Sequence, residues 1–189
     1  VAASKLKNTG GSIYLQANGD LNLAGITSDK DVSLVAVGNI NNTFTDPNQA
    51  VIKAKGDLTM LVGSGSSIGN VASTTGGVTT AERAVSYDIG GTLLAADASQ
   101  DVVLRALNHD LVFDRIGGNG QMVLHTLGNI EQALDGLALT GRGITLDAGG
   151  NVGYLGDNNK YLQLSTGTGT VDGAAGGFVR LDDTTANAL

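Results

Sequence analysis

Five polar residues between positions 108 and 115 form the densest group of side chains in this sequence that could do chemistry. The group consists of Asn108, His109, Asp110, Asp114 and Arg115. Paired carboxylates can cleave a polysaccharide, one as an acid and the other as a base or nucleophile. The alternative, which we favour, is an exposed turn beside a strand at 111–113. Motifs typical of pectin-degrading β-helix hydrolases are incomplete, because Asp182-Asp183 has no Gly-His-Gly or Arg-Ile-Lys companion.

Metal binding is not predicted. The two histidines, His109 and His125, have no His-x-x-x-His spacing, and the chain has no cysteine, so a tetrahedral zinc site lacks ligands. The Gly-Gly-x-Gly-x-Asp calcium repeat is missing as well. We interpret the remaining acidic residues of the second half as solvated turns, namely Asp147, Asp157, Asp172, Asp182 and Asp183. We therefore expect no catalytic residue, no metal, no cofactor and no enzymatic activity.

Three further motifs are interpreted as structural. Gly167-Thr-Gly169-Thr and Gly117-Gly-Asn-Gly120 lack the Lys-Ser/Thr that completes a phosphate loop, so we expect turns. Tyr14 and Tyr161 are expected to face outward as ordinary wall rather than as a sugar platform. The glycosylation triplet Asn41-Asn42-Thr43 is expected to remain unused. Residues that bind a partner cannot be named from the sequence.

Composition narrows the class of protein. The 189 residues are 41% hydrophobic and only 4% aromatic, so the core must be aliphatic. The 29 glycines lack a collagen period. A net charge of −7 argues against nucleic-acid partners, and no apolar run suits membrane insertion. No signal peptide is evident from Val1, and we expect a segment of a longer repetitive protein.

One short phrase recurs along the chain. Two or three apolar residues alternate, a Gly follows, then Asp or Asn, then an aliphatic residue. It occurs at 13–21, 32–40, 50–58, 122–130 and 144–152. Alternation with a period of two predicts strands with one buried face. We expect the Gly to supply a positive φ, and the Asp or Asn to bond its own turn.

The spacing of the phrase predicts a solenoid. Successive glycines lie 19, 18 and 22 residues apart where they are adjacent, and the 72 residues between Gly56 and Gly128 leave room for four more turns. One degenerate copy there places Leu94, Ala96 and Ala98 before Asp101. We predict an all-β fold: one right-handed parallel β-helix over 1–189, with about nine rungs of about 20 residues. The period excludes a helical fold, and a β-sandwich is the alternative.

Residues 63–91 interrupt the phrase. They are rich in Gly, Ser and Thr, and Thr79 and Glu82 have the spacing of a helix capping box. A short helix or a loop could leave the rod here, or a degenerate rung could contain Val85, Tyr87 and Ile89. We favour an irregular rung with a protruding loop. A second protrusion is expected at 41–48, which holds the only proline.

The phrase is similar to the repeats of the filamentous haemagglutinin family, large bacterial exoproteins exported by two-partner secretion. The segments that carry the resemblance are 11–21 and 143–153, the latter followed by an expected loop at 157–159 and a strand at 161–164. The resemblance implies a right-handed β-helix in the shaft of a surface fibre of a Gram-negative bacterium. The family's N-terminal secretion domain is not evident.

Three functions follow from these observations. The first, which we favour, is a non-enzymatic segment of a secreted or surface-exposed adhesin, with a host-cell or matrix glycan or protein as receptor and an outer-membrane secretion partner. The second is a β-helix lyase or hydrolase acting on acidic polysaccharide. The third is the stalk of a leukotoxin-like or contact-dependent-inhibition exoprotein.

Overall fold

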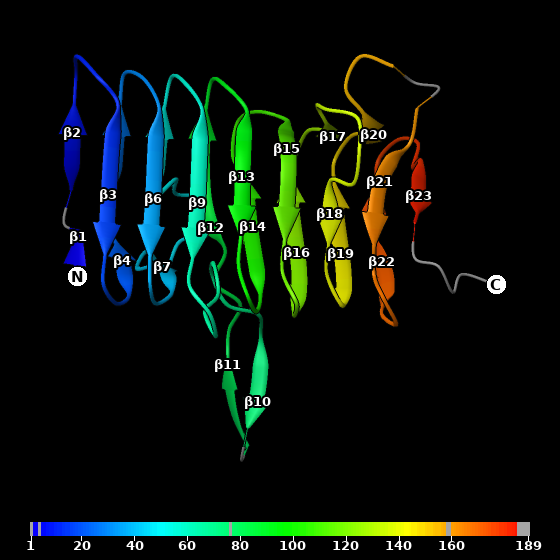
Figure 1. Ribbon diagram of the computed structural model, residues 1–189, viewed down its shortest axis with the longest axis horizontal. Helices are drawn as coiled ribbons and strands as arrows, with labels where there is room; N and C mark the ends of the chain where they lie inside the picture. Colours follow the sequence, from blue (N-terminus) through cyan, green and yellow to red (C-terminus); the bar gives the residue numbers. More distant parts are fainter. Residues whose placement is uncertain (1, 4, 76, 158–159, 185–189) are drawn as a thin grey trace.

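The computed structural model describes residues 2–3, 5–75, 77–157 and 160–184. All the regular structure in these ranges is β, and the strands stack as successive coils along one axis (Figure 1). The prediction of an all-β parallel β-helix is confirmed, because every strand pair along the rod is parallel. The described ranges hold no helix, and thus none of the length and apolar character needed to cross a bilayer.

Two long sheets form the main walls. Sheet I contains β2 (Leu6–Asn8), β5 (Ile26–Ser28), β8 (Ile52–Ala54), β12 (Val85–Ile89), β14 (Val102–Ala106), β16 (Gln121–Thr126), β19 (Gly143–Ala148) and β22 (Thr170–Ala175). Sheet II contains β3 (Ile13–Ala17), β6 (Val32–Ala36), β9 (Leu58–Val62), β13 (Leu93–Asp97), β15 (Leu111–Gly117), β18 (Leu139–Thr140), β21 (Leu162–Ser165) and β23 (Leu181–Asp183).

A third side of the coil is built differently in the two halves of the rod. In the first half it lies between sheet II and sheet I, and its strands are β1 (Ala2–Ala3), β4 (Leu21–Leu23) and β7 (Ile40–Asn42). In the second half it lies between sheet I and sheet II, and its strands are β17 (Ile130–Gln132) and β20 (Val152–Tyr154). The short third strand therefore follows sheet II in the first half of the rod and sheet I in the second half.

The coils number eight along each long sheet, one fewer than expected. Regular coils have the predicted length, since Val102 pairs with Met122 and Met122 with Ile144. The coil from Leu58 to Leu93 takes 35 residues because it contains an excursion out of the rod. The stretch between Gly56 and Gly128 consequently holds fewer turns than its length predicts.

The core is a continuous aliphatic column. Most inward positions of the phrase are buried as predicted, including Val32, Leu34 and Ala36 in β6, and the aliphatic residue after the corner is buried in every copy. Leu15 and Ala50 are only partly buried, and Val51 fills the interior in place of Ala50. The degenerate copy differs, because a register shift between Leu93 and Ala95 turns Leu94 outward, where it is 41% exposed. Leu93 and Ala96 fill the interior in its place, so the expected inward position of Leu94 was wrong.

The corner glycines do not have the conformation that the sequence suggested. None of the glycines of the phrase has a positive φ. Gly38 is required instead by close approach, since a Cβ atom there would lie 2.3 Å from Asp20 Oδ1 in the previous coil. The expected turn bond is also wrong: the Asp20 carboxylate accepts the N–H of Asn39, one coil further on, at 2.7 Å. The phrase thus joins coils rather than stabilising its own bend.

These bonds form two ladders at opposite corners. At the corner after sheet II, each side chain accepts the N–H of the next coil along the series Asp20, Asn39, Ser67, Asp101 and Gln121. At the corner after sheet I, one series is Asp31, Asp57 and Thr92, and another is Asp110, Asn129, Asn151 and Phe178. The copies at 50–58, 122–130 and 144–152 belong to this second corner, whereas the first two copies belong to the first corner.

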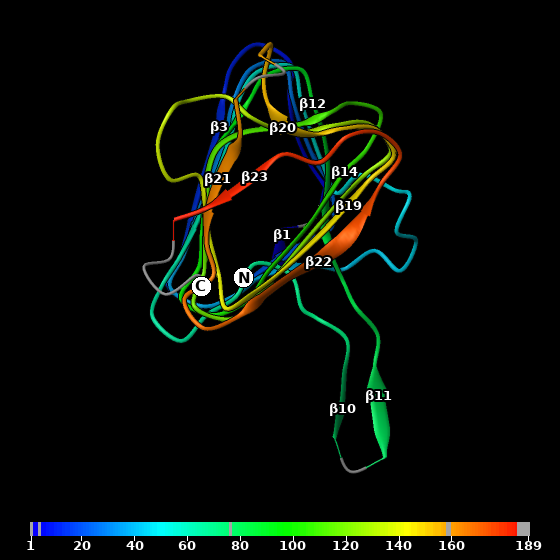
Figure 2. The same ribbon diagram turned by 90° about the vertical axis from the view of Figure 1, so that its right-hand side faces the viewer.

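Two protrusions leave the rod on the side of sheet I (Figure 2). The larger is an antiparallel hairpin of β10 (Ser73–Thr75) and β11 (Val78–Thr80), whose strand residues are all exposed. Thr79 lies in β11, so the suggestion of a helix capping box was wrong. Val85, Tyr87 and Ile89 lie inward in the irregular coil. The smaller protrusion spans 43–50, and Asn158 and Asn159 of the loop expected at 157–159 lie outside the described residues.

The close approach at Gly38 predicts a difference between two glycines of the same phrase. Gly38→Ala should lower the free energy of unfolding by about 1–3 kcal/mol, because its Cβ would overlap the Asp20 carboxylate. Gly19→Ala is the matched control, since nothing lies within 4 Å of its Cβ position, and it should change stability by less than about 1 kcal/mol. Urea unfolding followed by circular dichroism measures both. Equal effects would contradict the role assigned to the glycine.

Candidate functional site

The polar group at 108–115 does not converge on one site. Asn108, with a left-handed φ of 70°, donates from Nδ2 to Asp88 Oδ2 at 3.1 Å, and His109 Nε2 lies 3.2 Å from Asp88 Oδ1. Asp110 faces the other way and accepts the N–H of Asn129. These residues therefore join neighbouring coils, as the favoured interpretation of an exposed turn requires.

Asp114 and Arg115 are separated from that turn. Arg115 donates from Nε to Asp97 Oδ2 at 3.0 Å in the preceding coil. Partial burial, followed by the charge of Asp57, raises the pKa of the Asp114 carboxyl above its ordinary value. A raised carboxyl pKa suits a general acid. Asp114 and Arg115 nevertheless have different partners, because Arg115 bonds Asp97 whereas the charge that acts on Asp114 is that of Asp57. Asp110 accepts the N–H of Asn129, whereas the carboxylate that acts on Asp114 is Asp57, so Asp110 and Asp114 are held in different surroundings.

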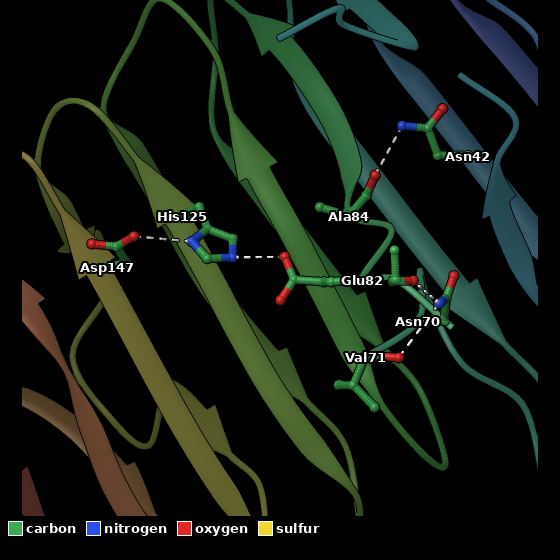
Figure 3. Close-up of polar contacts among 8 residues, drawn as sticks. Asn42, Asn70, Val71, Glu82, Ala84, His125 and Asp147 are labelled. Carbon is green, nitrogen blue, oxygen red and sulfur yellow. Dashed lines mark hydrogen bonds and ion pairs between the residues drawn. The ribbon is translucent and has the colours of Figure 1, made fainter. Parts of the chain in front are cut away.

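A cluster of polar contacts lies at the base of the hairpin (Figure 3). His125 in β16 lies between two carboxylates, with Nε2 2.9 Å from Glu82 Oε1 and Nδ1 3.3 Å from Asp147 Oδ2. The imidazole is only 15% exposed. His125 and Asp147 are direct partners in the register of β16 and β19, and Glu82 reaches His125 from the returning limb of the hairpin.

Backbone and amide contacts complete the hairpin base. Asn70 and Arg83 exchange backbone hydrogen bonds at 2.9 and 3.0 Å, and Asn70 Nδ2 donates to the carbonyls of Ala81 and Val71. Asn42 Nδ2 donates to the Ala84 carbonyl at 2.9 Å, which ties the returning limb to β7 (Figure 3). The hairpin is thus clamped to two other coils, through His125 of β16 and Asn42 of β7.

This geometry clamps the hairpin to the wall. The carboxylates approach opposite nitrogens of His125, so they share no point at which a metal ion could contact all three. Over the described ranges no group of three His, Asp or Glu side chains could hold a metal ion. The contacts of His125 include no hydroxyl nucleophile. The arrangement fixes the hairpin base and holds the Glu82 carboxylate against His125 of sheet I.

The other motifs considered in the sequence are the outward tyrosines, the glycosylation triplet and the Gly-Thr-Gly segment, and each lies in the wall or in a turn of the rod. Tyr14 and Tyr161 face outward as expected, 65% and 54% exposed. The sequon residue Asn41 donates from Nδ2 to Asn22 Oδ1 at 2.9 Å, between coils. Gly167 has a left-handed φ of 64° in a turn.

The expectation that the acidic residues of the second half lie in solvated turns was wrong for four of the five. Asp147 lies in β19, Asp172 in β22, and Asp182 and Asp183 in β23, each in a strand that pairs with a neighbouring strand. Asp147 bonds His125, Asp172 accepts the N–H of Gly173, and Asp183 accepts the Thr166 hydroxyl.

Comparison with models of protein families, with curated proteins and with solved structures found no match to this chain.

The clamp predicts a local effect of His125→Ala. Loss of both carboxylate contacts should lower the opening free energy of residues 70–84 by about 1 kcal/mol, so their amide hydrogens should exchange faster. Exchange in β16 and β19 should change much less. Hydrogen exchange read by mass spectrometry measures this, and His109→Ala is the control, because His109 lies away from the hairpin. Unchanged exchange at 70–84 would refute the clamp.

The raised pKa of Asp114 predicts a pH-dependent stability. The fold favours the protonated carboxyl, so stability should fall as the pH rises from below the ordinary Asp pKa through the raised one. Asp114→Asn keeps the neutral form and should be more stable than the parent chain at neutral pH, with the difference disappearing in acid. Urea unfolding at both pH values tests this. A gain that persists in acid would show that ionisation is not the cause.

Proposed function

We propose that this chain is a rigid β-helical shaft segment of a large secreted or surface-exposed bacterial adhesin of the filamentous haemagglutinin type. The observation that carries the proposal is the continuous aliphatic column through eight coils, with a polar hairpin and a polar loop outside it. In a solenoid each coil contacts only its neighbours, so length grows without a larger core. Such a body spans distance and displays its protrusions.

The partners follow from this role. Attachment requires a glycan or protein receptor on a host cell or matrix. Export to the surface of a Gram-negative bacterium requires an outer-membrane secretion partner for the full-length protein. The lack of cysteine is compatible with passage through an envelope before folding. The Gly-Asp and Gly-Asn corner phrases support the same assignment through their resemblance to the repeats of that family.

A non-enzymatic role is part of the proposal. The acidic and basic residues at 108–115 are engaged singly with neighbouring coils, which supports a wall rather than a cleft for polysaccharide cleavage. The stalk of a secreted toxin would share the same shaft and would differ in the domains attached to it. The local phrase and the fold favour the shaft in both cases.

Attachment is tested with beads coated with the chain. Coated beads should bind cultured epithelial cells or immobilised matrix above albumin-coated beads. The informative comparison is a variant in which residues 72–80 are replaced by two glycines, which removes the exposed hairpin while keeping the rod. Binding no higher than the albumin control would refute the attachment role. In parallel, release of oligosaccharide from polygalacturonate or hyaluronan would refute the non-enzymatic role.

A further inference from the structure

The two protrusions enclose a pocket on the outer side of sheet I. Its volume is about 250 Å³, and its walls come from the 43–50 loop, the returning limb of the hairpin and β14. The wall residues that matter for binding are Phe44, Thr45, Glu82, Arg83 and Arg105. The pocket therefore lies where both excursions from the regular coil meet the rod.

Two arginines and one acidic residue, Glu82, line this pocket. Within the described ranges neither Arg83 nor Arg105 forms an ion pair, although the chain has 18 acidic residues. Arg105 Nε is shielded from solvent and has no hydrogen-bond partner. Because Nε is closed to solvent, a ligand in the pocket would be held by the two terminal nitrogens of the Arg105 guanidinium, which carry its other four N–H donors.

The neighbours of Arg105 in the sheet offer its guanidinium no carboxylate, so a ligand could supply one. In the sheet register Arg105 lies between Ser86 of β12 and His125 of β16, and neither is an anion. Glu82, the acid in the pocket wall, is bonded to His125 at 2.9 Å. A guanidinium binds a carboxylate through two parallel N–H donors, which makes an external carboxylate the best-matched anion.

The other walls favour a sugar that bears the carboxylate. Phe44 is partly buried against the core and borders the pocket, which gives a fixed aromatic surface for the C–H face of a ring. The Thr45 hydroxyl forms no hydrogen bond within the described ranges, so it can serve a ligand hydroxyl. The volume is below the range of about 300–1,000 Å³ for drug-sized ligands and suits one monosaccharide unit.

We propose that the pocket between the 43–50 loop and the hairpin base binds a sugar acid, with Arg105 and Arg83 holding its carboxylate and Phe44 packing against its ring. This proposal names a ligand class for the attachment role above and rests on it. The clamp at His125 then has a second consequence, because it fixes the limb that carries Arg83.

The test is isothermal titration of the whole chain with methyl glucuronide as the probe. The chain should bind this probe at least about tenfold more tightly than methyl glucoside, acetate or inorganic phosphate. Arg105→Gln should weaken binding of the glucuronide by about tenfold or more. This variant removes an unpaired, partly buried cation, so the fold should persist, and circular dichroism checks that it does. Arg142→Gln is the matched control at an exposed corner and should bind like the parent chain.

Several outcomes overturn the proposal. These are no saturable binding of methyl glucuronide, equal binding of any of the three comparison probes, or the same affinity in the folded Arg105→Gln and Arg142→Gln variants. The test does not use cells, so its failure is distinguishable from failure of bead attachment. If the glucuronide binds as expected and coated beads do not attach, the pocket stands and the attachment role falls.

Discussion

The structure depends on hydrogen bonds between a corner side chain and the backbone N–H of the next coil. A strand ladder satisfies the backbone only where strands run in register, and the coil must bend between strands, where N–H groups would otherwise lack partners. At Asp20, Asp57 and Asp110 a carboxylate supplies the acceptor at 2.7–2.8 Å. Because the acceptor belongs to the preceding coil, the same bond closes the bend and fixes the stacking register.

The fold was largely predictable because its main signal is local. Alternation places Val32, Leu34 and Ala36 inward in β6, and it does so in any strand with one buried face. The corner to which a phrase belongs was not predictable, since Gly38-Asn39 and Gly128-Asn129 read alike while lying at different corners. Only the pairing partners distinguish them. The bulge that turns Leu94 outward is likewise a property of its alignment with β9.

The site was harder to predict because its residues come from different coils. His125 and Asp147 are 22 residues apart, which is one coil length, so the repeat contained a signal that could have joined them. Glu82 lies 43 residues before His125, in a segment with no repeat to give it a register. Over the described ranges Arg105 has no ion pair, and its stacking neighbours, Ser86 and His125, carry no carboxylate. Which residues stack on Arg105 is not visible in a linear motif.

Stacking also explains why the outward positions vary while the inward ones repeat. Coils lie about 4.8 Å apart, so a charge repeated at one outward position would meet its own kind in each neighbour. The chain instead pairs opposite charges across successive coils, as in Lys55 with Asp29 and Lys160 with Asp135. Such exposed pairs each contribute about 0–1 kcal/mol, so their main effect is to avoid repulsion. Arg83 and Arg105 form no such pair within the described ranges, and neither do Lys30, Lys53 and Arg142. What sets the two arginines apart is their place beside Phe44 in a pocket, and this enclosed position favours a ligand there.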